Sequence, residues 1–273
     1  MSPEIKIVGV MLLKNEEWTA GAALEAILGF CDEIYVFVNQ SEDTTESVVR
    51  EIAKREKHVH VRCIQNGRES HEPLEVLAGR PYWVFAVDGD EIYSREELAE
   101  LRGRLLSGQY SEYFKLTASC LHVKDFDRSQ GTAEGYLTPQ AKAVTKLYNF
   151  NAITEWSGVP HQRLHGGVLK FKDGYHDDSR YHFGQEYEWE DSPFHCLHLC
   201  FMRRTSVVTQ EQARKGLWNI SDRESEKHQK SWWKRWWPVS SRPTSPSKFD
   251  NYCVGESCWV PLQSLNVPLR IVP

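Results

Sequence analysis

The sequence predicts an α/β protein whose sheet is mostly parallel and flanked by helices. Strand-like apolar stretches alternate with segments of helical periodicity through the first hundred residues. Each of the main apolar stretches also ends abruptly in polar residues. Strand–helix alternation at this rhythm is typical of right-handed βαβ units, which place their strands in parallel.

The expected strands are short, rich in β-branched residues and almost wholly apolar, as expected of strands that are buried on both faces. They span residues 5–13, 33–38, 59–64 and 83–87. Apolar residues at helical spacing predict helices over 18–30 and 74–78. They also predict a helix between these two, whose buried face contains Val48, Val49 and Ile52.

The middle of the chain continues with a helix over 94–106, which Ser94 caps, and strands over 113–123 and 142–150. Residues 125–139 are mostly polar, which predicts a loop that covers the candidate ligand-binding site described below. Residues 1–205 are expected to form one domain. Residues 206–273 are expected to form a helical and irregular extension, rich in tryptophan and basic residues around 232–237.

The composition is that of a soluble globular protein. The net charge of −5 argues against a general polyanion binder. The first residues lack the pattern of a signal peptide, and the longest apolar run, residues 7–13, is too short to span a bilayer. Seven cysteines without regular spacing fit a reducing compartment. We therefore expect a cytoplasmic protein without a transmembrane segment. The oligomeric state stays open.

Three polar segments directly follow strands of the predicted sheet: residues 14–17, 39–45 and 88–91. The carboxyl ends of parallel strands share one sheet edge, so these segments are expected to line one crevice. Asp88 and Asp90 are separated by one residue and can converge on one target. Hard carboxylate oxygens on a turn suit Mg²⁺ or Mn²⁺, which bind phosphate as well. The alternative is an acidic turn that only ends a strand. A Gly-x-Gly-x-x-Gly or Walker motif is absent.

These three segments together resemble the family 2 glycosyltransferases, which have the GT-A fold. The resemblance rests on the sequences of residues 11–17, 41–45 and 85–91, and it covers the first hundred residues best. Asn39-Gln40 stands where the family usually has an aspartate, which bears on the preference for the nucleobase. An asparagine amide still offers both a donor and an acceptor to a base edge.

The resemblance implies a role for each matching residue. Lys14, Glu16 and Asn39 would contact the nucleoside, and Arg68 would lie near the base or a phosphate. Asp88 would reach the ribose or a metal-bound water, and Asp90 would bind Mn²⁺ or Mg²⁺ directly. The neighbouring residues Leu13 and Gly89 are placed with the donor-binding group.

The family often completes the metal shell with a histidine far downstream, for which we choose His198. A basic segment follows it, as in relatives. The competing candidates are His176, His182 and His195. The pattern His195-Cys196-x-His198-x-Cys200 could instead indicate zinc, although no paired ligand cluster of standard spacing is present.

An inverting transfer needs a base for the acceptor hydroxyl, and the candidates are Asp191 and His161. A retaining mechanism would not need this base. Trp156, on a glycine turn, is either a platform for a sugar ring or a core residue.

The predicted function is metal-dependent transfer of a sugar from a UDP- or GDP-linked donor to an acceptor hydroxyl, with inversion. The acceptor could be a glycan, a lipid-linked glycan, a protein or a nucleic acid. One alternative is a nucleotidyltransferase-like metal–phosphate enzyme. The other is a non-catalytic module that binds glycan or nucleic acid through the tryptophan-rich segment.

Overall fold

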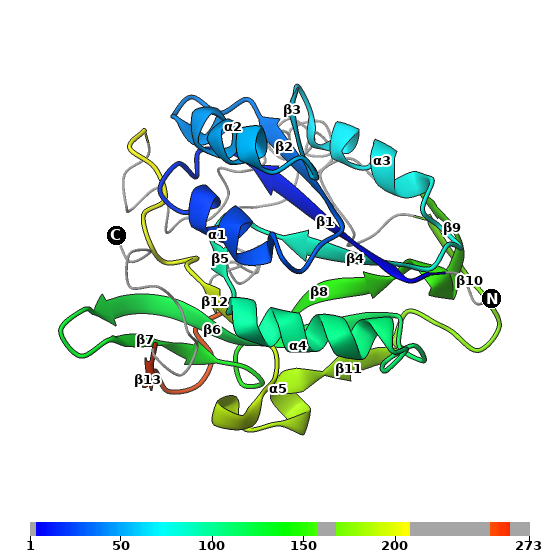
Figure 1. Cartoon of the computed structure of the whole chain (residues 1–273). Helices are drawn as coiled ribbons and strands as arrows, with labels where there is room; N and C mark the ends of the chain where they lie inside the picture. The colour runs from blue at the N-terminus through cyan, green and yellow to red at the C-terminus, as the bar shows by residue number, and fades with distance from the viewer. Residues whose placement is uncertain (1–3, 158–167, 208–251, 263–273) are drawn as a thin grey trace, which may run out of the picture.

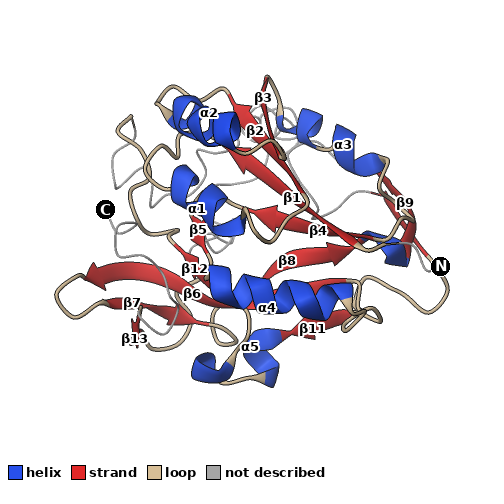
Figure 2. Cartoon of the chain, viewed as in Figure 1, coloured by secondary structure: helices blue, strands red, loops and turns tan. Residues whose placement is uncertain are grey.

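A computed structural model describes residues 4–157, 168–207 and 252–262 of the chain. Its centre is a large sheet with the strand order β13-β7-β6-β8-β4-β1-β2-β3, covered by helices (Figure 1). Figure 2 shows how helices and strands alternate through the first half of the chain. The predicted α/β fold class is confirmed.

The parallel part of the sheet comes from the first ninety residues. Its strands are, in order, β3 (Val59–Ile64), β2 (Glu33–Asn39), β1 (Lys6–Leu13) and β4 (Tyr82–Val87). Every neighbouring pair is parallel, and Met11 of β1 lies opposite both Val36 and Val87. The carboxyl ends of these strands therefore meet at one edge of the sheet, as the sequence predicts.

The sheet continues beyond β4 with antiparallel neighbours. These strands are β8 (Val144–Asn149), β6 (Lys115–Asp127), β7 (Thr132–Leu137) and β13 (Cys258–Pro261). The prediction of a loop over 125–139 is wrong, because β6 and β7 form a hairpin there. Its polar residues lie on an exposed face, where Lys124 pairs with Glu134, whereas Ala133 is buried. In a hairpin with one exposed face, buried apolar residues alternate with exposed polar residues. The polar residues make such a segment resemble a loop in sequence.

Three short strands complete the sheet beside β6. β11 (Arg180–His182) and β12 (His195–His198) run parallel to β6, and β5 (Glu91–Ile92) pairs antiparallel with β12. His198 lies opposite Glu91 in this pairing and opposite His122 in the pairing with β6. The far-downstream histidine is thereby brought to the turn that follows β4.

Helices cover both faces of the sheet, and each face has its own apolar core. One core contains Ile7 and Met11 of β1 with residues of α1 (Ala20–Ile27), α2 (Thr45–Arg55) and α4 (Arg95–Leu106). Ser94 caps α4 as predicted, its hydroxyl accepting the Glu97 N–H. Burial on both faces explains why β1 is apolar at successive positions.

The second core contains Val8 and Val10 of β1. Short elements supply the rest of it: α3 (Glu72–Glu75), the 3₁₀ turn η2 (Phe150–Ala152), and the small hairpin of β9 (Ile153–Ser157) and β10 (Val168–Phe171). Trp156 is 3% exposed and packs against Phe150 and His71 in this core. Trp156 is therefore a core residue and not a platform for a sugar ring.

The end of the described chain returns to the sheet, because β13 pairs with β7. The tryptophan-rich segment around 232–237 lies outside the described residues, and the division at residue 205 stays a prediction. Among the helices that the structure describes, none is both long and apolar enough to cross a bilayer.

Candidate active site at the strand ends

Hydrogen bonds join the segments that follow β1 and β2. The Asn15, Glu16 and Glu17 backbone N–H groups donate to Ser41 Oγ, Thr45 Oγ1 and Asp43 Oδ2, over 3.0, 2.8 and 3.2 Å. Asn15 has a φ of 53°, a left-handed conformation that asparagine tolerates better than most residues. The two polar segments therefore form one structural unit.

Glu17 fastens this unit to a distant part of the chain. Its carboxylate accepts the Ser206 N–H at 2.7 Å and the Thr44 hydroxyl at 2.6 Å. Burial alone would raise the pKa of Glu17, but these hydrogen bonds outweigh it and lower the pKa to about 2. The segment after β12 is thus fixed beside the end of β1.

The turn after β4 packs directly against the end of β1. A Cβ atom on Gly89 would lie 2.4 Å from Glu16 Oε2 and 2.6 Å from Leu13 Cδ2. Such contacts are far inside van der Waals distance, so any side chain at this position would displace Glu16 and Leu13. Leu13 therefore contributes to the packing that positions Asp88 and Asp90, and its side chain is fully buried.

Asp90 is the buried centre of the site. It is 2% exposed, and its Oδ2 accepts a hydrogen bond from Arg204 Nη1 at 2.7 Å. The same guanidinium nitrogen lies 3.0 Å from Glu16 Oε1. Burial alone would raise the pKa of Asp90, but Arg204 leads the charges that lower it, so Asp90 is an anion. A buried carboxylate pair bridged by one arginine is stable only while the cation is in place.

Two histidines lie next to this carboxylate. His198 Nε2 is 3.7 Å from Asp90 Oδ2, and His198 Nδ1 is 2.9 Å from His122 Nδ1. Burial lowers the pKa of His122 to about 4 and that of His198 to about 3. Both rings are therefore neutral at pH 7, and neutral imidazole is the form that binds metals.

A second buried ion pair lies behind the turn. The Lys146 side chain is 2% exposed, the Glu91 side chain is fully buried, and their charged groups are in contact. Lys146 Nζ also lies 3.7 Å from Asp88 Oδ2. Burial raises the pKa of Glu91, but Lys146, the Tyr93 hydroxyl and the Asp88 N–H all favour its carboxylate form.

The other predicted donor-binding residues lie along the same edge. Asn39 is the last residue of β2 and is 3% exposed. Lys14 is half-buried directly after β1, and Arg68 is exposed in the 3₁₀ turn η1 (Gly67–Ser70) after β3. Gly67 of this turn approaches Leu12 of β1. The structure thus places these positions around the ends of β1, β2 and β3.

Not every predicted residue is brought to this edge. Asp191 is exposed in the 3₁₀ turn η3 (Trp189–Asp191), which precedes β12, whereas His198 ends that strand. His161 lies outside the described residues. Of the competing histidines, His176 is exposed, His182 contacts Thr117, and His195 contacts Glu97. Within the described part of the chain, the histidine that faces Asp90 is His198.

Sequence reasoning missed Arg204, Lys146 and His122. Lys146 had a usable signal, because a lone lysine in an apolar strand needs a buried partner. His122 had a weaker one: Cys120-x-His122 repeats the spacing of Cys196-x-His198. In the sheet these two pairs lie side by side in register. The donor atoms of Cys120, His122 and His198 lie within 4.8 Å of one another.

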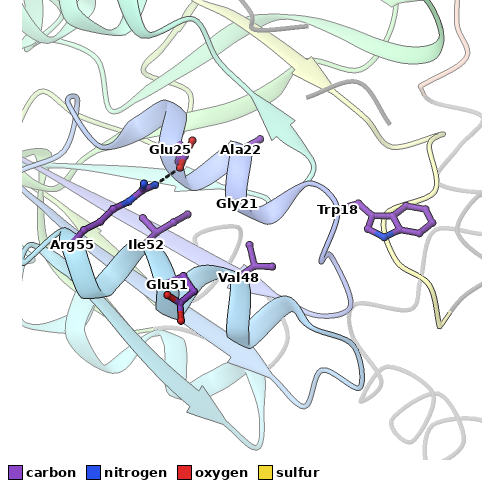
Figure 3. Close-up of a pocket in the computed structure, with 8 residues that line it drawn as sticks. All are labelled: Trp18, Gly21, Ala22, Glu25, Val48, Glu51, Ile52 and Arg55. Atoms are coloured by element: carbon purple, nitrogen blue, oxygen red, sulfur yellow. Dashed lines mark hydrogen bonds and ion pairs between the residues drawn. The ribbon is translucent and has the colours of Figure 1, made fainter. Parts of the chain in front are cut away.

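The surface also has an open groove between α1 and α2 (Figure 3). Figure 3 shows the ion pair of Arg55 with Glu25 across it. The groove is lined by Trp18, Gly21, Ala22, Glu25, Val48, Glu51, Ile52 and Arg55. This set contains none of the residues predicted to bind the donor or the metal.

No protein-family model matches the chain, and no curated protein matches it. Among solved structures it is similar to a mannosyltransferase from Pyrobaculum calidifontis in complex with GDP-mannose and Mn²⁺. The identity is 16%, the TM-score 0.33, and the match covers 44% of this chain and 36% of the other.

It is also similar to glucosyl-3-phosphoglycerate synthase from Mycobacterium tuberculosis, in complex with Mn²⁺, UDP and glucosyl-3-phosphoglycerate. Here the identity is 21%, the TM-score 0.32, and the match covers 42% of this chain and 44% of the other. The chain therefore matches less than half the length of either structure.

Proposed function

We propose that the protein is a divalent-cation-dependent glycosyltransferase. It transfers a sugar from a UDP- or GDP-linked donor to an acceptor hydroxyl, with inversion at the anomeric carbon. The observation that carries this proposal is the meeting of three polar strand-end segments around Asp88, Asp90 and His198. In open α/β sheets, this edge is where ligands bind.

The charge of the cluster supports a bound cation. Four carboxylates, of Glu16, Asp88, Asp90 and Glu91, face two side-chain cations, Lys146 and Arg204, in the contacts given above. Asp90, at the centre of these contacts, is buried and ionised, and the neutral His198 ring lies beside it. A carboxylate oxygen and a neutral imidazole nitrogen are both ligands that suit a divalent cation.

The donor set fits Mn²⁺ or Mg²⁺. Asp90 Oδ2 and His198 Nε2 are separated by 3.7 Å, which exceeds a hydrogen bond. Both atoms can reach one ion, since metal–oxygen and metal–nitrogen bonds are about 2.1 Å long. When bound, the ion would hold the diphosphate and stabilise the charge that develops on it. Asp90 and His198 would hold the ion.

The remaining residues would bind and orient the donor. Asn39, Lys14 and Glu16, with Arg68, surround the edge where the nucleoside would lie, and Asp88 would reach the ribose or a metal-bound water. Arg204 supplies a fixed positive charge beside Asp90, suited to a diphosphate leaving group. Asp191 and His161 stay predictions for the base.

Calorimetry with UDP, GDP and their sugar conjugates tests the proposal. We expect one of these ligands to bind only with Mn²⁺ or Mg²⁺ present, and EDTA to abolish the binding. The absence of binding for every nucleotide and metal combination would contradict the proposal. Release of pyrophosphate from a nucleoside triphosphate would favour the nucleotidyltransferase instead.

The binding-module alternative is tested in the full-length chain. Truncation near residue 223 would also remove β13, which is a strand of the sheet. Replacing Trp232, Trp233, Trp236 and Trp237 by serine avoids this. Metal-dependent hydrolysis of the sugar nucleotide should survive these substitutions if the strand-end site is the active site.

A further inference from the structure

The two buried histidines next to Asp90 form a chain of hydrogen-bonding groups. β6 and β12 are parallel and in register, so that His122 lies directly beside His198. His122 Nε2 lies 3.0 Å from the Lys142 carbonyl oxygen, and the two Nδ1 atoms are 2.9 Å apart. The Tyr252 ring packs on both imidazoles, with centroids 4.5 Å from His122 and 5.4 Å from His198.

The positions of the ring protons follow from these contacts. A carbonyl oxygen only accepts, so His122 Nε2 is the protonated nitrogen and donates to Lys142. Neutral His122 then has a lone pair on Nδ1. The short contact between the Nδ1 atoms needs one proton, so His198 Nδ1 donates to His122. The remaining nitrogen, His198 Nε2, lies 3.7 Å from Asp90 Oδ2, farther than a hydrogen bond, so it presents a lone pair rather than a proton to Asp90.

We propose that His122 is a positioning residue, which holds His198 in the Nδ1–H tautomer so that the Nε2 lone pair is available to the divalent cation of Asp90. The inference rests on the proposed function, because it names what prepares one of the metal ligands. Metal-binding histidines usually donate their other ring N–H to an oxygen acceptor. In this chain the acceptor is a second imidazole, which the Lys142 carbonyl in turn orients.

A variant without His122 would lack the acceptor for the His198 Nδ1–H group. Without it, nothing in these contacts holds the proton of His198 on Nδ1. The proton would move to Nε2, where the N–H group can donate a hydrogen bond to the Asp90 carboxylate. The hydrogen bond would then compete with the metal for both of its protein ligands.

A zinc ion held by Cys120, His122 and His198 is the competing reading of the same cluster. Cys120 Sγ lies 3.8 Å from His122 Nδ1. Two histidine nitrogens on a tetrahedral zinc would be about 3.3 Å apart. The observed 2.9 Å instead matches an N–H···N hydrogen bond.

The first test measures the tautomer of His198 in the metal-free protein by ¹⁵N NMR of the imidazole nitrogens. We expect the Nδ1–H tautomer in the wild type and the Nε2–H tautomer in His122→Phe. An Nε2–H tautomer in the wild type would overturn the proposal. This measurement uses neither metal nor donor, so its result is independent of whether the proposed function is correct.

The second test measures Mn²⁺ affinity by electron paramagnetic resonance. His122→Phe should weaken it by roughly 10–100-fold, as for other outer-shell partners of metal ligands. His122→Asn, whose side-chain oxygen can accept near the Nδ1 position, should restore most of the loss. Unchanged affinity in both variants would contradict the proposal, and thermal unfolding shows whether each variant folds.

Cys120→Ser is the matched control. It removes the thiol beside His122 and leaves both imidazoles, so Mn²⁺ affinity should stay at the wild-type value. The zinc reading gives the opposite result: purified protein would contain one zinc per chain, and Cys120→Ser would lose it. That outcome would overturn the assignment of His122 as a positioning residue.

Discussion

Asp90→Asn is expected to abolish Mn²⁺-dependent binding of the sugar nucleotide and all transfer. The substitution keeps the size of the side chain but removes the anion that faces His198 and Arg204. Loss of an outer-shell partner already weakens metal binding by roughly 10–100-fold, so loss of a direct ligand should exceed about 100-fold. Calorimetric titration with Mn²⁺, with and without nucleotide, measures it.

Asp32→Asn is the matched control for this experiment. Asp32 also pairs with an arginine, Arg102, at 2.6 Å, but it lies directly before β2, at the opposite edge of the sheet from the proposed site. The Asp32→Asn substitution should lower the melting temperature and leave the Mn²⁺ affinity unchanged. Equal metal affinity in Asp90→Asn and wild type would show that Asp90 is not a ligand.

Lys146→Met is expected to have the largest effect on stability. It leaves the Glu91 carboxylate fully buried without the cation that contacts it. Breaking a buried ion pair from one side costs about 3–5 kcal/mol. For a domain of this size, that corresponds to a fall in melting temperature of about 6–20 °C. Thermal unfolding by circular dichroism measures the change.

The double variant Lys146→Met/Glu91→Gln tests whether the loss of stability in Lys146→Met comes from the unpaired charge of Glu91 or from altered packing. If the buried charge causes the loss, the double variant should be more stable than Lys146→Met alone. Lys124→Met removes an exposed lysine from its pair with Glu134 and should leave the melting temperature essentially unchanged. Equal losses in Lys146→Met and Lys124→Met would contradict this account of the pair.

The parallel part of the sheet could be predicted because its signal is local. β1 and β4 are apolar on both faces and end abruptly at Lys14 and Asp88, so their bounds and shared edge follow from the sequence. Gly89 and Asp90 lie where that edge predicts. The hairpin of β6 and β7 was missed because its exposed face is polar, like a loop.

The partners of Asp90 and Glu91 could not be predicted, because they come from distant parts of the chain. Arg204 is 114 residues from Asp90, and Lys146 is 55 residues from Glu91. His122 and His198 become neighbours only when β12 pairs with β6 in one register. Such contacts depend on the order of strands in the sheet, and local patterns do not determine that order.

Anomalous diffraction at the manganese absorption edge tests the central claim most directly. Crystals of the full chain would be grown with Mn²⁺ and the nucleotide that binds in calorimetry. The account predicts one peak within bonding distance of both Asp90 Oδ2 and His198 Nε2, with the nucleotide along the ends of β1 and β2. A peak among Cys120 and the two Nδ1 atoms, or bound nucleotide without manganese at Asp90, would contradict it.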